Sequence, residues 1–205
     1  MFPRNYKWLT REIDSLRPDT DYARIWALTV TYRVNDFMMN AVYTLGLQCF
    51  TQSPAASELM ALTTRKAILR KQQRNADTMK HFWKWFESGT SHPESQRSIE
   101  IVNCIHASLA RNSPGTFPPS EIIYTCAWIG VFFHRLQRSL GLAGFTRNQK
   151  IAAHRYWEEF AGRLWSGEGE SACFPATFAG MLEYVQAYEI ARGRRSSQDA
   201  SWRPP

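Results

Sequence analysis

Apolar residues recur at intervals of three and four along most of this sequence, which is the spacing of one face of an α-helix. The pattern is clear from Tyr22 to Asn35 and in the almost wholly apolar run from Phe37 to Phe50. No segment alternates convincingly between apolar and polar residues, as a half-buried strand would, and no internal repeat is present. The 205 residues are enough to bury one core. We therefore predict an all-α fold in a single bundle of about seven to eight helices.

Capping signals divide this bundle into separate helices. The segments Ser91–Glu94 and Thr146–Gln149 each have a hydroxyl residue three positions before Glu or Gln, which is the spacing of a capping box. Ser53 followed by Pro54 predicts another helix start, because Ser is a good N-cap and Pro suits the first helical position. A helix that is basic at its start and aromatic at its end is expected from Arg65 to Glu87.

Charge, cysteine usage and hydropathy exclude several classes of protein. The net charge is +7, but no basic helix has interleaved aromatic residues, so we expect no nucleic-acid partner. Three of the four cysteines lie in apolar stretches and none forms a Cys-x-x-Cys pair, which indicates reduced, buried thiols in a cytoplasmic protein. No uninterrupted apolar run reaches about 18 residues, so we expect no integral membrane segment. The N-terminal residues lack the apolar core of a signal peptide.

The C-terminal end is basic and has almost no apolar period. We expect a single helical domain over residues 1–192, followed by a disordered basic tail over residues 193–205. The alternative is that Arg192, Arg194, Arg195 and Trp202 dock the protein on an anionic bilayer, where each basic residue contributes about 1 kcal/mol. The predicted location is cytoplasmic, with peripheral contact to a membrane left open.

One histidine stands out among the candidate chemical groups. His106 is placed on the apolar face of a helical run, with Ile99, Val102, Ile105 and Leu109 at helical spacings around it. A histidine held in this way can ligate a haem iron, but more often it is a satisfied core residue. In the second case it should make a buried hydrogen bond, because an unsatisfied buried imidazole costs about 1–3 kcal/mol.

A second set of candidates lies on the basic helix. Arg74 and Thr78 are four residues apart and share one face, and His81 lies on the same side. A buried Arg–Thr pair can bind a propionate, a bound oxygen species or a substrate carbonyl. The alternative is a solvent-facing Arg above a Thr that bonds to its own backbone. No Ser-His-Asp order, His-x-x-x-His zinc pair or Glu-x-x-His di-iron pair supports a hydrolase or a di-iron enzyme.

Taken in order, these elements resemble the mpaB oxygenase family, which includes the bacterial rubber oxygenases called latex-clearing proteins. An Arg-x-x-Asp-Thr element is present as Arg74, Asp77 and Thr78, and an Ile-His-Ala element within VNCIHASLAR contains His106. A polar turn, a helix of the SEIIYTCAWIGVFF type, a Leu-Gly step and a Thr cap before the Trp-containing RYWEEFAG follow in the same order. The resemblance runs from REIDSL near the N-terminus to about Gly167.

The resemblance implies an all-helical, globin-like fold that holds a b-type haem. His106 then corresponds to the proximal iron ligand, and Arg74 and Thr78 correspond to the polar pair on the distal side. Family members use dioxygen to cleave carbon–carbon double bonds in long isoprenoid chains. The implied function is a haem-dependent oxygenase that acts on a lipophilic isoprenoid or polyketide intermediate of natural-product biosynthesis. The many aromatic residues agree with such a substrate, although they can equally fill a core of large side chains.

Two departures from the family keep an alternative open. The chain is shorter than typical members, and Asp77 stands where the rubber-cleaving branch has Lys. The alternative is a haem-free isomerase or cyclase on the same scaffold, with Arg74, Asp77 and His106 as polar groups in an apolar pocket. A non-enzymatic carrier of small molecules is a third hypothesis. The oligomeric state, including a homo-oligomer, is left open.

Overall fold

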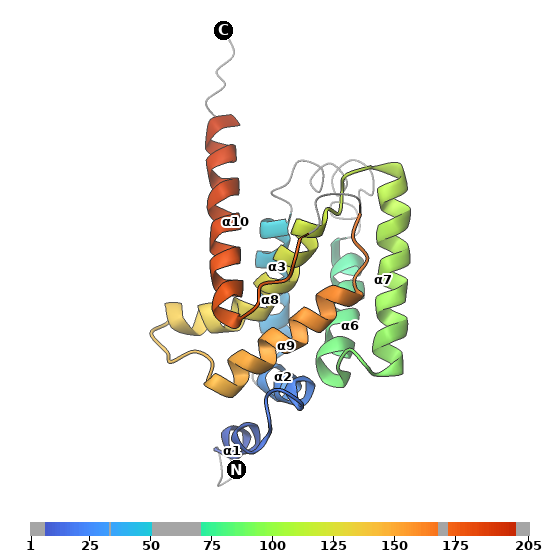
Figure 1. The fold of residues 1–205 in the computed structure, drawn as a ribbon. Coiled ribbons are helices and arrows are strands. Elements are labelled where there is room, and N and C mark those ends of the chain that lie inside the picture. The colour runs from blue at the N-terminus through green and yellow to red at the C-terminus, as the bar shows by residue number, and fades with distance from the viewer. Residues whose placement is uncertain (1–6, 33, 51–70, 168–171, 200–205) are drawn as a thin grey trace.

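The computed structural model describes residues 7–32, 34–50, 71–167 and 172–199. In that part of the chain it contains eight helices and no strands, which confirms the predicted all-α bundle (Figure 1). The helix predicted to start at Pro54 lies outside the described residues. The helices are α1 (Trp8–Ser15), α2 (Tyr22–Thr31), α3 (Asp36–Phe50), α6 (Lys71–Ser88), α7 (Pro93–Asn112), α8 (Pro119–Ser139), α9 (Arg147–Arg163) and α10 (Phe178–Asp199).

Helices α8 and α9 lie at the centre of the bundle. Helix α9 packs against α1, α2, α8 and α10, and α8 also contacts α3. Helix α8 is buried over most of its length, which explains why its sequence is apolar on nearly every side. Helix α6 lies against α2, α3 and α7, and α7 stands at the edge of the molecule (Figure 1).

Aromatic side chains fill the core where α2, α6 and α9 meet. The indole of Trp26 stacks on Tyr156 with ring centroids 5.5 Å apart and meets Trp157 edge-on at 5.7 Å. Phe86 and Phe160 complete the cluster. Trp26, Trp157 and Tyr156 are at most 1% exposed, so these rings form the core and do not line an open pocket.

Gly130 lets α9 and α10 approach α8 closely. A Cβ atom added at this position would lie 2.5 Å from the terminal methyl of Met181 and 2.7 Å from Cδ1 of Trp157. The flexible end of Met181 can move aside, but the rigid indole of Trp157 cannot, so a larger residue at this position would force α9 away from α8.

The two predicted capping boxes have different outcomes. The box at the start of α9 is confirmed: Thr146 Oγ1 accepts from the Gln149 backbone, and Gln149 Oε1 accepts from the Thr146 backbone at 2.9 Å. The box predicted at Ser91 is wrong. The N-cap of α7 is His92, whose Nδ1 accepts the backbone N–H of Glu94 at 3.3 Å. Pro93 suits the first helical position, which places the cap at His92.

Helix α10 continues beyond the boundary expected at residue 192. It ends at Asp199 and extends away from the other helices at its C-terminal end (Figure 1). The side chain of Arg192 is largely buried, donates to Glu121 of α8 at 3.1 Å and donates to the Tyr188 hydroxyl at 2.7 Å. Arg192 therefore anchors α10 on α8 and is not part of a free basic tail. None of the described helices has the length and apolar composition needed to cross a membrane.

The described thiols are all free, but only one is buried. Cys126 lies in the middle of α8, and burial raises the pKa of its thiol. Cys104 is exposed on the outer side of α7, and Cys173 is exposed in the segment before α10. The expectation of buried thiols is therefore wrong for Cys104 and Cys173. Cys104 lies on a helix, and an apolar local sequence does not show which face of a helix is covered, whereas Cys173 lies outside the helices.

The carboxylate of Glu159 connects α9 to two distant parts of the chain. Its oxygens accept from the Tyr22 hydroxyl at 2.7 Å, from Arg163 at 2.6 Å and from Ser91 at 3.3 Å. Burial acts to raise the pKa of Glu159, but hydrogen bonds from Tyr22, Thr90 and Arg163 outweigh it and lower the pKa. The folded state thus favours the ionised carboxylate.

Replacing Glu159 by Gln is expected to lower the free energy of unfolding at neutral pH by about 1–2 kcal/mol, because charge-assisted hydrogen bonds are lost. A carboxyl whose pKa is lower in the folded state than in the unfolded state stabilises the fold at neutral pH. This stabilisation is lost as the pH falls below about 4.3, which is the pKa of the carboxyl in the unfolded chain. The difference between wild type and variant in urea unfolding should therefore shrink in acid. Glu158→Gln is the control, because the ion pair that Glu158 makes with Arg155 in the described part of the chain is exposed. Equal effects of the two variants at neutral pH would contradict this prediction.

Candidate functional site

Helices α6 and α7 carry all the predicted site residues and run antiparallel from the turn at residues 89–92 (Figure 1). Ser98 of α7 joins them: its hydroxyl oxygen accepts from Trp85 Nε1 at 3.0 Å and lies 2.6 Å from Nδ1 of His81. We call these contacts the Ser98 clasp. Burial, followed by the charge of Lys84, lowers the pKa of His81, so its imidazole is neutral at physiological pH.

His106 lies eight residues beyond the clasp on the inward side of α7. Its ring stacks on Phe117 with centroids 4.3 Å apart and an angle of 15° between the planes. Nδ1 of His106 is shielded from solvent and has no hydrogen-bond partner in the described part of the chain. Burial lowers the pKa of His106 to about 4, so the imidazole is uncharged at neutral pH. The buried hydrogen bond expected for a core histidine is thus not made by Nδ1.

The predicted surroundings of His106 are only partly correct. Ile99 is buried, and Val102 and Leu109 are partly buried on the same side of α7. The prediction that Ile105 surrounds His106 on a covered face is wrong, because the side chain of Ile105 is 49% exposed. One step of about 100° round the helix separates it from His106, and this step places it outside the covered face.

Phe117 and Asn103 hold this region in place, and sequence reasoning missed both. The backbone carbonyl of Phe117 accepts from Gly167 N–H at 2.7 Å. Asn103 of α7 donates to the carbonyl of Arg163 at 2.9 Å and accepts from the backbone N–H of Trp165 at 2.8 Å. The segment that follows α9 is therefore tied to α7 and to the approach to α8. No local pattern in the sequence indicates contacts between residues so far apart.

Arg74 and Thr78 lie on the side of α6 that is turned toward α7. They share a helical face with His81, which contacts Ser98. Thr78 is partly buried, and Nη1 of Arg74 is shielded from solvent. This placement differs from the alternative of a solvent-facing arginine.

The register of the two helices places Arg74 near the level of His106. From the clasp, His106 is eight residues along α7, a rise of about 12 Å, and Arg74 is seven residues back from His81 along α6, a rise of about 10 Å. Because the helices are antiparallel, both steps run in the same direction in space. Arg74 and His106 therefore lie at about the same height along the two helices.

The structure separates Asp77 from the other candidates. Its side chain is 59% exposed and lies 4.0 Å from the ammonium group of Lys80. It is adjacent to Thr78 in sequence but about 100° away round the helix, toward solvent. Asp77 therefore does not share the buried face of Arg74 and Thr78.

Among the described residues, His106 is a candidate for the single axial ligand that a haem group takes from a protein. Among the described residues, no group of three or more His, Cys, Asp or Glu side chains gathers as a candidate site for a bare metal ion. A haem iron needs only one such ligand, because the macrocycle supplies the others. His106 has the properties that this ligand requires, since it is a neutral imidazole with a buried nitrogen that lacks a partner.

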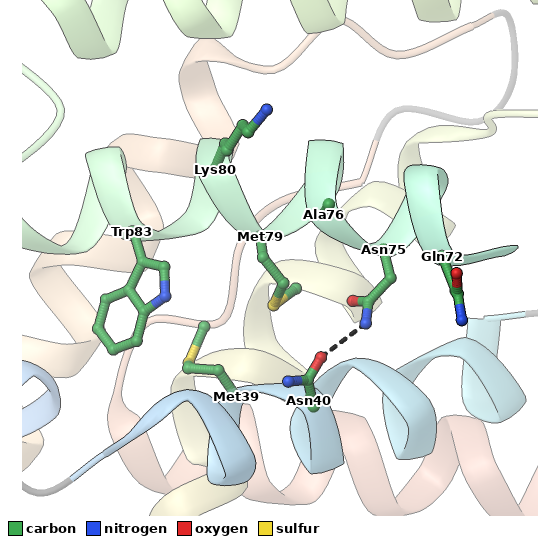
Figure 2. Close-up of a pocket in the computed structure, with 8 residues that line it drawn as sticks. All are labelled: Met39, Asn40, Gln72, Asn75, Ala76, Met79, Lys80 and Trp83. Carbon is green, nitrogen blue, oxygen red and sulfur yellow. Dashed lines mark hydrogen bonds between the residues drawn. The ribbon is translucent and has the colours of Figure 1, made fainter.

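A separate groove lies between α3 and α6 (Figure 2). It has a volume of about 440 Å³. Met39, Met79 and Trp83 form its apolar lining, and the amide of Asn75 donates to Oδ1 of Asn40 at 2.6 Å across it. Figure 2 shows these side chains between the two helices, whereas Lys80 points away from α3. We call this feature the α3–α6 groove.

Comparison with known proteins does not assign the chain to a family. No protein-family model matches the sequence, and no curated protein matches it significantly.

Proposed function

We propose that this chain is a haem-dependent oxygenase of the kind that the mpaB resemblance implies, acting on a lipophilic isoprenoid or polyketide. The observation that carries the proposal is the state of His106: a partly buried, uncharged imidazole whose shielded Nδ1 has no partner in the described part of the chain. Most buried polar atoms in folded proteins have a hydrogen-bond partner, so an orphaned imidazole nitrogen calls for an explanation, and a bound iron would supply one. Iron coordination uses the neutral form of imidazole that burial favours here.

The residues of α6 and α7 have distinct parts in this proposal. His106 holds the iron, and Phe117 fixes the plane of its ring by stacking. Arg74 and Thr78 supply hydrogen-bond donors from the facing helix at the same level. When bound, the haem supplies the activation of dioxygen, and the protein supplies the ligand, the dry surroundings and the polar contacts.

The haem-free isomerase or cyclase is the weaker candidate on two observations. A general base works best when its pKa is near the operating pH, and burial holds the pKa of His106 at about 4. That mechanism also needs Asp77 in the same pocket as Arg74 and His106, but Asp77 is exposed and pairs with Lys80.

The absorbance spectrum of the purified chain tests the proposal. Protein produced with a haem precursor, or mixed with haemin and passed through a desalting column, is expected to show a Soret band and about one haem per chain in a pyridine haemochromogen assay. Protein that retains no haem under either condition would refute a haem enzyme. Turnover of a polyketide or isoprenoid intermediate by such haem-free protein would then support the isomerase or cyclase.

Replacing Arg74 by Ala is expected to weaken the binding of fluoride to the haem-loaded ferric protein by about 10- to 100-fold, which is the loss of one hydrogen bond to an anion. Fluoride titration measures this without knowledge of the substrate. Helical content and thermal midpoint should change little, because Arg74 lies near the start of α6. Arg97→Ala is the matched control, since Arg97 is exposed on α7. Fluoride affinity that is the same in both variants would place Arg74 away from the iron.

A further inference from the structure

Two leucines are exposed where α8 connects to α9, at a turn that protrudes from the bundle on the side away from α7 (Figure 1). Leu140 is 68% exposed and Leu142 is 55% exposed. Gly141 between them has a φ of +76°, which favours glycine. Single exposed apolar residues are common, but two leucines at the tip of one protruding turn form a local apolar surface. We call residues 138–147 the α8–α9 turn.

Hydrogen bonds at the base of the α8–α9 turn fix its backbone. The N–H of Leu142 donates to the carbonyl of Gln137 at 2.9 Å, and the N–H of Phe145 donates to Nδ1 of His134 at 2.8 Å. Nη1 of Arg138 donates to the carbonyl of Leu142 at 3.4 Å, which holds a guanidinium group beside the leucines. The folded backbone therefore keeps the two leucines at the outer end of the turn.

Basic side chains surround the α8–α9 turn. Arg138 and Arg147 are exposed, and Lys150 is partly buried. Burial is the first cause of the lowered pKa of His134, and the charges of Lys150 and Arg138 add to it, which places both cations near its ring. In the described part of the chain, none of the three cations forms an ion pair with a carboxylate. The sequence contains no Asp or Glu from residue 122 to residue 157.

Two of these cations occupy positions that do not favour helix stability. Arg147 and Lys150 lie in the first turn of α9, which contains no acidic residue. The positive end of the helix dipole lies there and disfavours positive charge. An anionic partner at this turn would offset the repulsion, because it would be attracted both by the side chains and by the helix dipole.

We propose that the α8–α9 turn docks the protein on an anionic lipid bilayer. Leu140 and Leu142 enter the boundary between the headgroups and the acyl chains, and the cations Arg138, Arg147 and Lys150 contact the negatively charged headgroups. A bilayer presents negative charge and an apolar layer to the same protruding turn, whereas a nucleic-acid backbone offers no apolar layer to the leucines. The inference does not depend on haem or on the proposed oxygenase activity.

Co-sedimentation with sucrose-loaded vesicles tests the docking. The wild-type protein is expected to bind vesicles of equal parts phosphatidylcholine and phosphatidylserine, and to bind phosphatidylcholine vesicles at least about 10-fold more weakly. Raising the salt concentration should weaken binding to the anionic vesicles, because it shortens the Debye length. The double variant Leu140→Ser, Leu142→Ser is expected to bind them about 10- to 100-fold more weakly, as the loss of two inserted leucines implies. Arg147→Gln should weaken binding by about 5-fold.

Two double variants are the matched controls, and circular dichroism confirms that each protein is folded. The substitutions Ile101→Ser and Ile105→Ser remove two residues of α7 that are 48% and 49% exposed, and should leave binding unchanged. The substitutions Arg194→Gln and Arg195→Gln remove charges at the C-terminal end of α10 and should change binding by less than about 2-fold, since charges beyond a Debye length of about 10 Å contribute little.

Four outcomes would overturn the proposal. The first is that the wild-type protein does not bind the anionic vesicles at low salt, which would favour an acidic protein as the partner of the α8–α9 turn. The second is equal binding to both kinds of vesicle. The third is equal binding by the leucine variant, the isoleucine control and the wild-type protein, which would indicate adsorption through net charge alone. The fourth is a loss of binding in the Arg194, Arg195 variant with none in the leucine variant, which would assign docking to the C-terminal end.

Discussion

Replacing His106 by Ala is expected to reduce haem retention to less than a tenth of the wild-type value and to leave the helical content unchanged. The variant removes the proposed iron ligand, and alanine is a good helix former, so α7 should persist. It also loses the stacking on Phe117, worth about 0.5–1.5 kcal/mol, but removes a buried nitrogen without a partner. The free energy of unfolding of the haem-free protein should therefore change by no more than about 1 kcal/mol. Haem is measured after desalting, and helicity by circular dichroism.

His92→Ser is the matched control for this experiment. His92 is exposed at the start of α7, and Ser can replace its capping hydrogen bond to the Glu94 backbone. This variant should retain haem as the wild-type protein does. Equal haem retention by the two variants would remove His106 from the proposed role, and loss of haem from both would indicate an unspecific effect on α7.

Replacing Trp157 by Ala is expected to cost about 3–5 kcal/mol in the free energy of unfolding, which is the largest stability effect anticipated for a single substitution in this chain. Trp157 is completely buried, and its indole contacts Trp26, Phe86 and Phe160. Its indole also lies against Gly130 of α8, where an added Cβ would be 2.7 Å from Cδ1 of Trp157. The cavity left by the indole cannot collapse easily, because rigid rings surround it on several sides.

Two further substitutions separate the cavity effect from the loss of an indole. Trp157→Phe should cost less than half as much, because Nε1 of Trp157 makes no hydrogen bond and only volume is lost. Trp8→Ala should cost less than about 1 kcal/mol, since Trp8 is 39% exposed and its ring contact among the described residues is an edge-on one with Tyr32. Urea unfolding at constant pH measures all three. A cost below about 2 kcal/mol for Trp157→Ala would show that the neighbouring rings repack.

The helical architecture follows from local patterns, and for that reason the sequence predicts it well. The apolar period and the Thr146–Gln149 box act over a few residues, so α9 begins where expected. The sequence predicts the N-cap of α7 one residue too early, at Ser91, because histidine is not a usual capping residue. The hydrogen bond from the Glu94 backbone to Nδ1 of His92 shows that His92 is the N-cap. Whether a residue on an apolar run is covered depends on a neighbouring helix, and this explains the errors at Ile105 and Cys104.

The candidate site is predicted in part. The sequence indicates that His106 is turned inward and that Arg74 and Thr78 share a face, since both follow from the helical period. It does not indicate that Asp77 is exposed, although Asp77 is adjacent to Thr78. The partners that build the region, Asn103 and Phe117, contact residues about 50–60 positions away, and only the packed chain brings them together.

The Ser98 clasp bears on the spacing of α6 and α7 at the height of Arg74 and His106. Among the described residues, the acceptor for the hydroxyl proton of Ser98 is Nδ1 of His81. Trp85 therefore donates a hydrogen bond to Ser98, and Ser98 donates one to His81. Arg74 and His106 lie about 10–12 Å along the two helices from the clasp. A tilt of about 5° between α6 and α7 at the clasp would change the separation of the helices at that height by about 1 Å. The Ser98 hydroxyl is thus one of the contacts that control the spacing of the helices carrying the proposed site.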